Sequence, residues 1–217
     1  MEQAHAELIS TLARIVAWAY FTLGIAFFAL FFIFCERRPI PLFRWPTPAG
    51  LTILAGIWLL NGLASPIAKR LVEGSVPPTT LLGFVSRPIT FDTLLNAALE
   101  EFARSGILQL FGGIPILGVW LNAAIFGFAH LAERAAEIAS YPQIAFLLPL
   151  DVFSFAMALT FVLIRLGLFW AILVHFASNA VRLVLITDSE VLNVCLFLLC
   201  IVALMVIAIR GLQSGGT

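Results

Sequence analysis

Long runs of apolar residues, separated by short polar breaks, make up most of the chain. Runs of about 20 residues match the ~30 Å hydrocarbon core of a bilayer, because a helix rises ~1.5 Å per residue. A connection broken by prolines is expected at 74–91 and an interfacial connection at 132–143. Asp92 is expected to be the N-cap of the helix that follows the connection at 74–91. The pattern predicts about seven helices, at 12–35, 49–68, 92–110, 114–132, 144–164, 168–186 and 189–210.

Composition supports a membrane protein. Hydrophobic residues make up 62% of the 217 residues and charged residues only 11%. We therefore expect an all-α, polytopic transmembrane helical bundle, with a single membrane-embedded domain over 1–217 and membrane lipid as its surroundings. The net charge is zero, so no nucleic-acid partner is predicted. Cys35, Cys195 and Cys200 fall in the predicted spans and are interpreted as small buried apolar residues.

Charged residues inside the predicted helix 92–110 need an explanation. An ionisable group in the middle of a membrane helix costs about 2.5–3.5 kcal/mol on insertion scales and marks a functional site by default. On a helix, Asn96, Glu100 and Arg104 fall with Thr93 within about a 60° stripe, which we expect to point inward. Glu101 lies beside this stripe, three residues before Arg104.

Two histidines complete the set of polar residues in apolar segments. His130 follows Phe126 by one helical turn, and Asn179 follows His175 by the same spacing. A carboxylate beside a histidine can hold and deprotonate a water, and a histidine with an amide can donate hydrogen bonds to an oxyanion. Together these groups suit peptide hydrolysis. Structural alternatives stay open: a buried ion pair, hydrogen bonds between helices, and simple packing for Phe126.

The three segments resemble the CPBP family of intramembrane proteases, which includes type II CAAX prenyl endopeptidases and bacteriocin-processing enzymes. The family pattern is Glu-Glu-x-x-x-Arg, then Phe-x-x-x-His, then His-x-x-x-Asn or Asp, each on a membrane helix. Glu100-Glu101 match the first pair, and "FGFAH" (126–130) and "HFASN" (175–179) match the other two motifs fully. The resemblance covers about 92–184, which we take as the motif-bearing core.

One departure from the family pattern concerns the arginine. Two residues, instead of three, separate Glu101 from Arg104, so aligning on the Glu pair puts Ser105 where the family has Arg. Aligning on Arg104 would put Leu99 at the position of the catalytic Glu. Leucine cannot act as a base, so the first alignment is preferred. Arg104 can still reach Glu100 at i+4 or Glu101 at i+3.

The resemblance implies a role for each site residue. Glu100 is the general base that activates water, and His130 helps to position that water. His175 and Asn179 stabilise the oxyanion, while Glu101, Arg104 and Phe126 support these groups. We expect a metal-free glutamate-type site with no cofactor, because the chain lacks the His-Glu-x-x-His zinc signature. A divalent metal such as zinc is the alternative.

These observations predict an intramembrane endopeptidase acting on a membrane-associated protein or peptide tail. The substrate could be a CAAX-type C-terminus, a leader peptide or a C-terminal sorting anchor. A multi-pass integral membrane protein is expected, in the plasma (inner) membrane if the source is bacterial. Two alternatives are a non-catalytic immunity or scaffold relative that binds a membrane peptide, and a small transporter that uses Glu and His as a proton relay.

Overall fold

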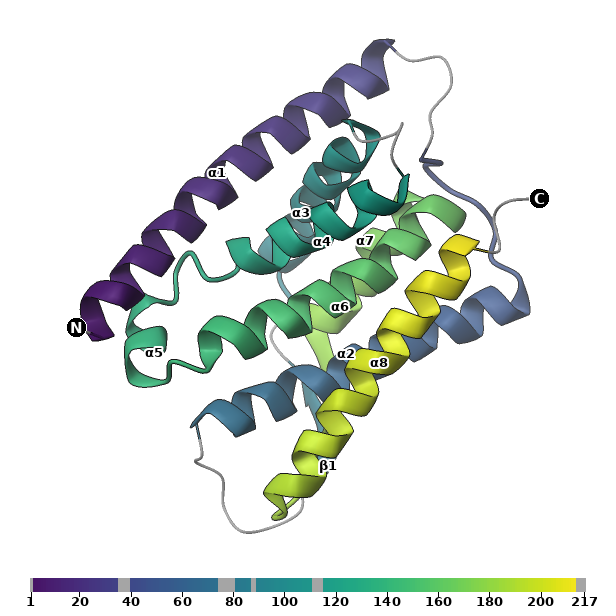
Figure 1. Cartoon of the computed structure of the whole chain (residues 1–217). Helices are drawn as coiled ribbons and strands as arrows, with labels where there is room; N and C mark the ends of the chain where they lie inside the picture. Colours follow the sequence, from purple (N-terminus) through teal and green to yellow (C-terminus); the bar gives the residue numbers. More distant parts are fainter. Residues whose placement is uncertain (1, 35–39, 74–80, 87–88, 111–114, 214–217) are drawn as a thin grey trace.

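The computed structural model describes residues 2–34, 40–73, 81–86, 89–110 and 115–213, so Cys35 lies outside the described residues. Within these ranges the chain forms eight helices and two strands (Figure 1). They are α1 (Glu2–Phe34), α2 (Pro48–Glu73), β1 (Leu81–Ser86), α3 (Phe91–Leu110), α4 (Pro115–Ala129), α5 (Ala135–Ser140), α6 (Ile144–Arg165), α7 (Leu168–Ala180), β2 (Val181–Ile186) and α8 (Glu190–Gln213).

The predicted helical membrane bundle is confirmed. Four described helices are long and apolar enough to cross a membrane: Gln3–Phe34, Pro48–Val72, Ile144–Arg165 and Glu190–Arg210. Two shorter apolar helices, Leu117–Ala129 and Leu168–Ala180, accompany them. The remaining two helices are α3 and the short α5, which lies in the predicted interfacial connection at 132–143.

Strand pairing is the main departure from the predicted elements. The helix expected over 168–186 ends at Ala180, and 181–186 forms β2. β2 pairs antiparallel with β1, which lies inside the expected connection at 74–91. The sequence "VRLVLI" of β2 is rich in β-branched and aliphatic residues, which fit a pleated strand once a partner strand satisfies their backbone groups. That partner comes from about 100 residues earlier in the chain, so a local pattern did not reveal it.

Several helix ends also differ from the prediction. The first helix begins at Glu2 instead of residue 12, and α2 continues through Lys69 to Glu73. The backbone N–H of Thr93 donates to the hydroxyl of Thr90 over 3.2 Å. Thr90 therefore provides the N-terminal cap that was expected from Asp92, which instead lies in the first turn of α3.

Helix α6 is the centre of the bundle. All its residues from Ser154 to Leu163 are buried, and it packs against α4, α8, α2 and α7. In Figure 1, α1 and α4 lie on one side of α6, and α8 lies on the other. A helix that is buried all round provides a fixed frame against which the helices of the site can be positioned.

Helix α3 is fixed in place by an unusually close approach to α1. A Cβ on Gly106 would overlap the carbonyl oxygen of Gly24, and a Cβ on Gly24 would overlap the backbone of Ala103. Nearby, the rings of Phe28 and Phe102 stack with centroids 4.8 Å apart. Two glycines therefore allow the backbones to touch, which fixes the position of the turn that carries Glu100 and Glu101.

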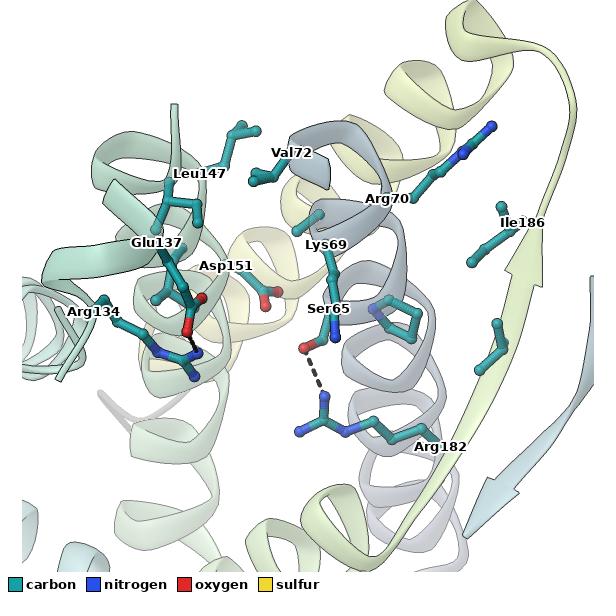
Figure 2. A pocket seen from close by; sticks show the side chains of 15 residues that line it. Ser65, Lys69, Arg70, Val72, Arg134, Glu137, Leu147, Asp151, Arg182 and Ile186 are labelled. Carbon is teal, nitrogen blue, oxygen red and sulfur yellow. Dashed lines mark hydrogen bonds and ion pairs between the residues drawn. The ribbon is translucent and has the colours of Figure 1, made fainter. Parts of the chain in front are cut away.

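A cavity of about 500 Å³ lies between α2, α6 and β2 (Figure 2). Apolar side chains of α6 and β2 form part of its wall, including Leu147, Leu148 and Val184. The remaining lining is mostly charged, and it includes residues from the connection that contains α5.

Candidate active site

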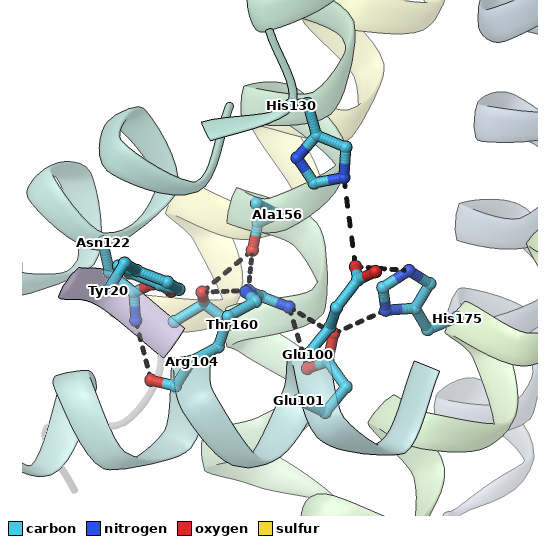
Figure 3. Close-up of polar contacts among 9 residues, drawn as sticks. All are labelled: Tyr20, Glu100, Glu101, Arg104, Asn122, His130, Ala156, Thr160 and His175. Atoms are coloured by element: carbon cyan, nitrogen blue, oxygen red, sulfur yellow. Dashed lines mark hydrogen bonds and ion pairs between the residues drawn. The ribbon is translucent and has the colours of Figure 1, made fainter. Parts of the chain in front are cut away.

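Three separate elements bring the predicted site residues together (Figure 3). Glu100 and Glu101 lie on α3, and His175 lies on α7. His130 lies in the turn directly after α4. The structure thus places both histidines beside the Glu pair, although His130 and His175 are separated by the whole of α6 in the sequence.

Glu100 lies between the two imidazole rings. Its Oε2 is 3.4 Å from Nε2 of His175 and 3.9 Å from Nε2 of His130. This oxygen is buried and has no hydrogen-bond partner among the described residues. The side chains of Glu100 and His130 are 23% and 32% exposed, whereas His175 is only 6% exposed. The side of the site formed by Glu100 and His130 is therefore its accessible side.

Glu101 is fully buried and holds both His175 and Arg104. Its Oε1 is 2.8 Å from Nδ1 of His175, and Nη1 of Arg104 donates to both carboxylate oxygens over 2.7 and 2.8 Å. A carboxylate paired with arginine is an acceptor, so Nδ1 of His175 donates to it. This hydrogen bond fixes the orientation of the ring and turns Nε2 toward Glu100.

The second imidazole is oriented by the backbone of α4. Nδ1 of His130 lies 2.8 Å from the carbonyl oxygen of Phe126. A carbonyl only accepts, so Nδ1 carries the proton and donates, which makes Nε2 the acceptor in the neutral ring. The ring of Phe126 meets His130 edge-on with centroids 4.6 Å apart. It also meets His175 edge-on at 6.5 Å.

Arg104 is buried completely and is bound by three elements. Besides the pair with Glu101, its Nη2 donates to the carbonyl oxygen of Ala156 over 2.5 Å and to the hydroxyl of Thr160 over 2.9 Å, both on α6. Its guanidinium carbon lies 5.2 Å from the centre of the Phe126 ring, at a distance that suits a cation–π contact. Of the two partners expected for Arg104, the structure shows Glu101.

Sequence reasoning missed the polar residues that support Arg104 from behind. Nδ2 of Asn122 donates to the carbonyl oxygen of Arg104 over 2.9 Å, and the hydroxyl of Tyr20 bonds to Oδ1 of Asn122. Thr160 completes this group from α6. Asn122 was detectable as a lone amide in an apolar helix, but its partner on α1 is about 100 residues away in the sequence.

Not every predicted site residue joins the cluster by a contact. Asn179 is half-buried one turn after His175, and its side chain makes no hydrogen bond to the described residues. Ser105 is buried, and its hydroxyl accepts from Nε2 of Gln109 over 3.3 Å. Asn96 is exposed, so the prediction that the whole polar stripe of α3 points inward is wrong at its first turns.

The described residues contain no group of three or more His, Cys, Asp or Glu side chains arranged to hold a metal ion. The groups of the cluster can themselves take part in acid–base chemistry. Oε2 of Glu100 is available to accept a proton, and Nε2 of His130 can accept a hydrogen bond. The imidazole of His175 is held by the buried carboxylate of Glu101.

Comparison with known proteins identifies the family of the chain. The family model described as "Type II CAAX prenyl endopeptidase Rce1-like" matches residues 57–181, which is more than half of the chain. The match contains the Glu pair, both histidines and Asn179. No curated protein and no solved structure matches the chain. The protein belongs to the Rce1-like family of type II CAAX prenyl endopeptidases.

Proposed function

We propose that the protein is an intramembrane endopeptidase that hydrolyses a peptide bond in a membrane-associated protein or peptide tail. Membership of a protease family and four apolar spans support a membrane peptidase. The observation that carries the proposal is the unpartnered Oε2 of Glu100, which faces Nε2 of both His130 and His175.

Glu100 and His130 suit the activation of a water molecule. Oε2 of Glu100 and Nε2 of the neutral His130 are both acceptors. A water bound to both would direct its two hydrogens to these atoms and leave a lone pair for attack on the peptide carbonyl. As the water attacks, its proton passes to Glu100, which later delivers it to the leaving amine.

His175 suits stabilisation of the oxyanion. With Nδ1 donating to Glu101, a second proton on Nε2 makes an imidazolium whose charge the buried carboxylate stabilises. Nε2–H then donates toward the same space that Glu100 faces. Asn179 follows one turn later on α7, and we assign its amide as the second donor.

Glu101, Arg104 and Phe126 act through other residues. Glu101 orients His175, Arg104 holds Glu101 with a two-point contact, and Phe126 contacts both imidazoles. They are therefore positioning residues. Because Arg104 reaches Glu101 from the i+3 position, the shorter spacing in this chain does not separate arginine from the Glu pair.

The finer parts of the proposal concern substrate, cofactor and membrane. CAAX-type C-termini, leader peptides and C-terminal sorting anchors are the substrate classes that the family resemblance suggests. We propose a metal-free reaction, in which Glu100 and His130 together accept both hydrogens of the water. We place the protein in the plasma (inner) membrane if the source is bacterial.

Cleavage of a model peptide by protein reconstituted in vesicles tests the proposal. Glu100→Gln removes the base while keeping the size of the side chain, and should abolish cleavage without loss of folded protein. Glu133→Gln is the matched control, because Glu133 is 83% exposed and outside the cluster. An active wild type with an equally active Glu100→Gln variant would refute the mechanism. Peptide binding without any cleavage by the wild type would favour a scaffold.

A further inference from the structure

Asn122 is a buried amide in the apolar helix α4, and the residue is 0% exposed. Its Nδ2 donates to the carbonyl oxygen of Arg104 on α3 over 2.9 Å, a bond that Figure 3 shows. Because a carbonyl only accepts, the nitrogen of the amide must face Arg104. Oδ1 therefore accepts from the hydroxyl of Tyr20 on α1. One side chain of α4 thus joins two neighbouring helices.

The bond from Asn122 is a contact between helices and is not needed by the backbone of α3. Within α3 the carbonyl of Arg104 accepts from the N–H of Leu108, as each helical carbonyl does four residues later. Asn122 uses the second lone pair of that oxygen. A buried amide that loses its partners is costly, so this contact favours one arrangement of α3 and α4 over all others.

The contact lies on the helix faces that carry the proposed site. Asn122, Phe126 and His130 follow one another at four-residue spacing, so they share one face of α4 and of the turn after it. Glu100 and Arg104 have the same spacing on α3. The contact is therefore about 6 Å from Glu100 along α3. A change of register by one residue would turn the face of α4 by about 100° and move His130 away from Glu100.

The contacts that orient the ring of His130 come from its own segment. The carbonyl oxygen of Phe126 accepts from Nδ1, and the ring of Phe126 packs edge-on, so both contacts move together with α4. Oε2 of Glu100 is 3.9 Å from Nε2, which is too long for a direct hydrogen bond. The distance between His130 and Glu100 therefore depends on how α4 is held against its neighbours.

Helix α1 holds this segment at two points. The hydroxyl of Tyr20 bonds to Asn122, and the hydroxyl of Ser10 donates to the carbonyl oxygen of Ala132 over 2.6 Å. Tyr20 lies ten residues after Ser10, and Asn122 lies ten residues before Ala132, so the two segments run antiparallel. His130 lies between the two points, and both Tyr20 and Ser10 are buried.

We propose that Asn122 is a positioning residue for the reaction. Supported by Tyr20, it holds α4 against α3 so that Nε2 of His130 faces Oε2 of Glu100. The inference rests on the proposed function, in which these two atoms share the attacking water, and it adds a residue to that function. His175 is positioned separately, because its Nδ1 bonds to Glu101. Loss of Asn122 should therefore displace His130 and leave His175 in place.

Nitrogen-15 NMR of the imidazole rings tests the position of His130 without any cleavage. The chain contains three histidines, His5, His130 and His175, so labelled histidine gives three sets of ring signals, and His130→Ala assigns the set of interest. In the full-length protein, Asn122→Leu keeps the size of the side chain but removes its polar atoms. It should shift the His130 signals and leave the other two sets nearly unchanged. Tyr20→Phe should shift the same signals by less, and it keeps the test available if Asn122→Leu does not fold.

Asn193→Leu is the matched control for the loss of a buried amide. Asn193 on α8 is 1% exposed, its Nδ2 donates to the carbonyl oxygen of Thr187 over 2.8 Å, and its Oδ1 accepts from the hydroxyl of Thr187 over 3.0 Å. Its loss should destabilise the protein as the loss of Asn122 does. It should leave the His130 signals and kcat per folded molecule unchanged.

Cleavage of a model peptide in vesicles shows whether this position matters for the reaction. Asn122→Leu should lower kcat by about 10- to 100-fold with KM nearly unchanged, because small displacements of reacting groups cost rates of this size. In a His130→Ala background the same substitution should have almost no further effect. A residue that acts through His130 loses its effect once His130 is absent.

Two results would overturn the proposal. One is that the His130 signals stay at their wild-type positions in every folded variant of Asn122 and Tyr20. The other is an equal loss of kcat with and without His130, which would make Asn122 a structural residue only. Failure of the proposed function is separate. A wild type that cleaves no peptide would refute that function, while the NMR signals would still decide whether Asn122 positions His130.

Discussion

Replacing Arg104 with methionine tests the claim that the cluster depends on a buried ion pair. The change keeps a long unbranched apolar stem but removes two hydrogen bonds to Glu101 and the donors to Ala156 and Thr160. Both members of the pair have side chains that are 0% exposed. Removing one partner of a buried pair leaves the other uncompensated, which costs about 3–5 kcal/mol.

This loss is large enough to measure by thermal unfolding. For a domain of this size each kcal/mol lowers Tm by about 2–4 °C, so Arg104→Met should lower it by about 6–20 °C. Intrinsic fluorescence of the purified protein in detergent can follow the transition, with Arg44→Met as the matched control. Arg44 is exposed, and its substitution should stay within about 0.5 kcal/mol.

A double-mutant cycle separates the pair from the other contacts of Arg104. Glu101→Gln alone should also destabilise the protein, and the double variant should lose about 1–3 kcal/mol less than the sum of the two single losses. Strictly additive losses would show that the two side chains are not coupled. A Tm for Arg104→Met within 2 °C of the control would refute the structural role assigned to the pair.

Four further predictions concern other parts of the site. His175→Ala should lower the cleavage rate in vesicles at least 100-fold, because the loss of one oxyanion donor lowers kcat by about that factor. Ser105→Ala should leave cleavage nearly unchanged, because its hydroxyl makes only a 3.3 Å contact with Gln109. Gly106→Ala should reduce the yield of monodisperse protein on size-exclusion chromatography, because its Cβ would overlap Gly24. Treatment with 1,10-phenanthroline should leave the cleavage rate unchanged, and inhibition reversed by added zinc would contradict the metal-free mechanism.

The fold class was predictable because a bilayer imposes a length and a composition on each span. Apolar runs of about 20 residues identified the four long helices. The strands were not predictable, since "VRLVLI" continues an apolar helix without a break and its partner strand lies far away in the sequence. Only the pairing of 81–86 with 181–186 decides between helix and strand there.

The sequence indicates which residues lie near one another in the candidate site better than it indicates which contacts they make. Residue type and spacing on single helices singled out Glu100, His130 and His175. Which carboxylate meets which partner depends on how α3 rotates against α6 and α7. That rotation is set by packing. Gly106 lets α3 touch α1, and the hydroxyl of Thr160 on α6 accepts a hydrogen bond from Arg104. Neither contact leaves a local signal in the sequence.

Oxygen exchange in a single turnover tests the central claim, that Glu100 acts as a base on water. Excess enzyme is mixed with a model peptide in water enriched in oxygen-18, and mass spectrometry then examines both the product and the enzyme peptide that carries Glu100. We predict one oxygen-18 in the new carboxylate of the product, none in Glu100, and no product from the Glu100→Gln variant. Oxygen-18 in the side chain of Glu100 would show that it attacks the substrate directly, and product formation by Glu100→Gln would show that it is not the base.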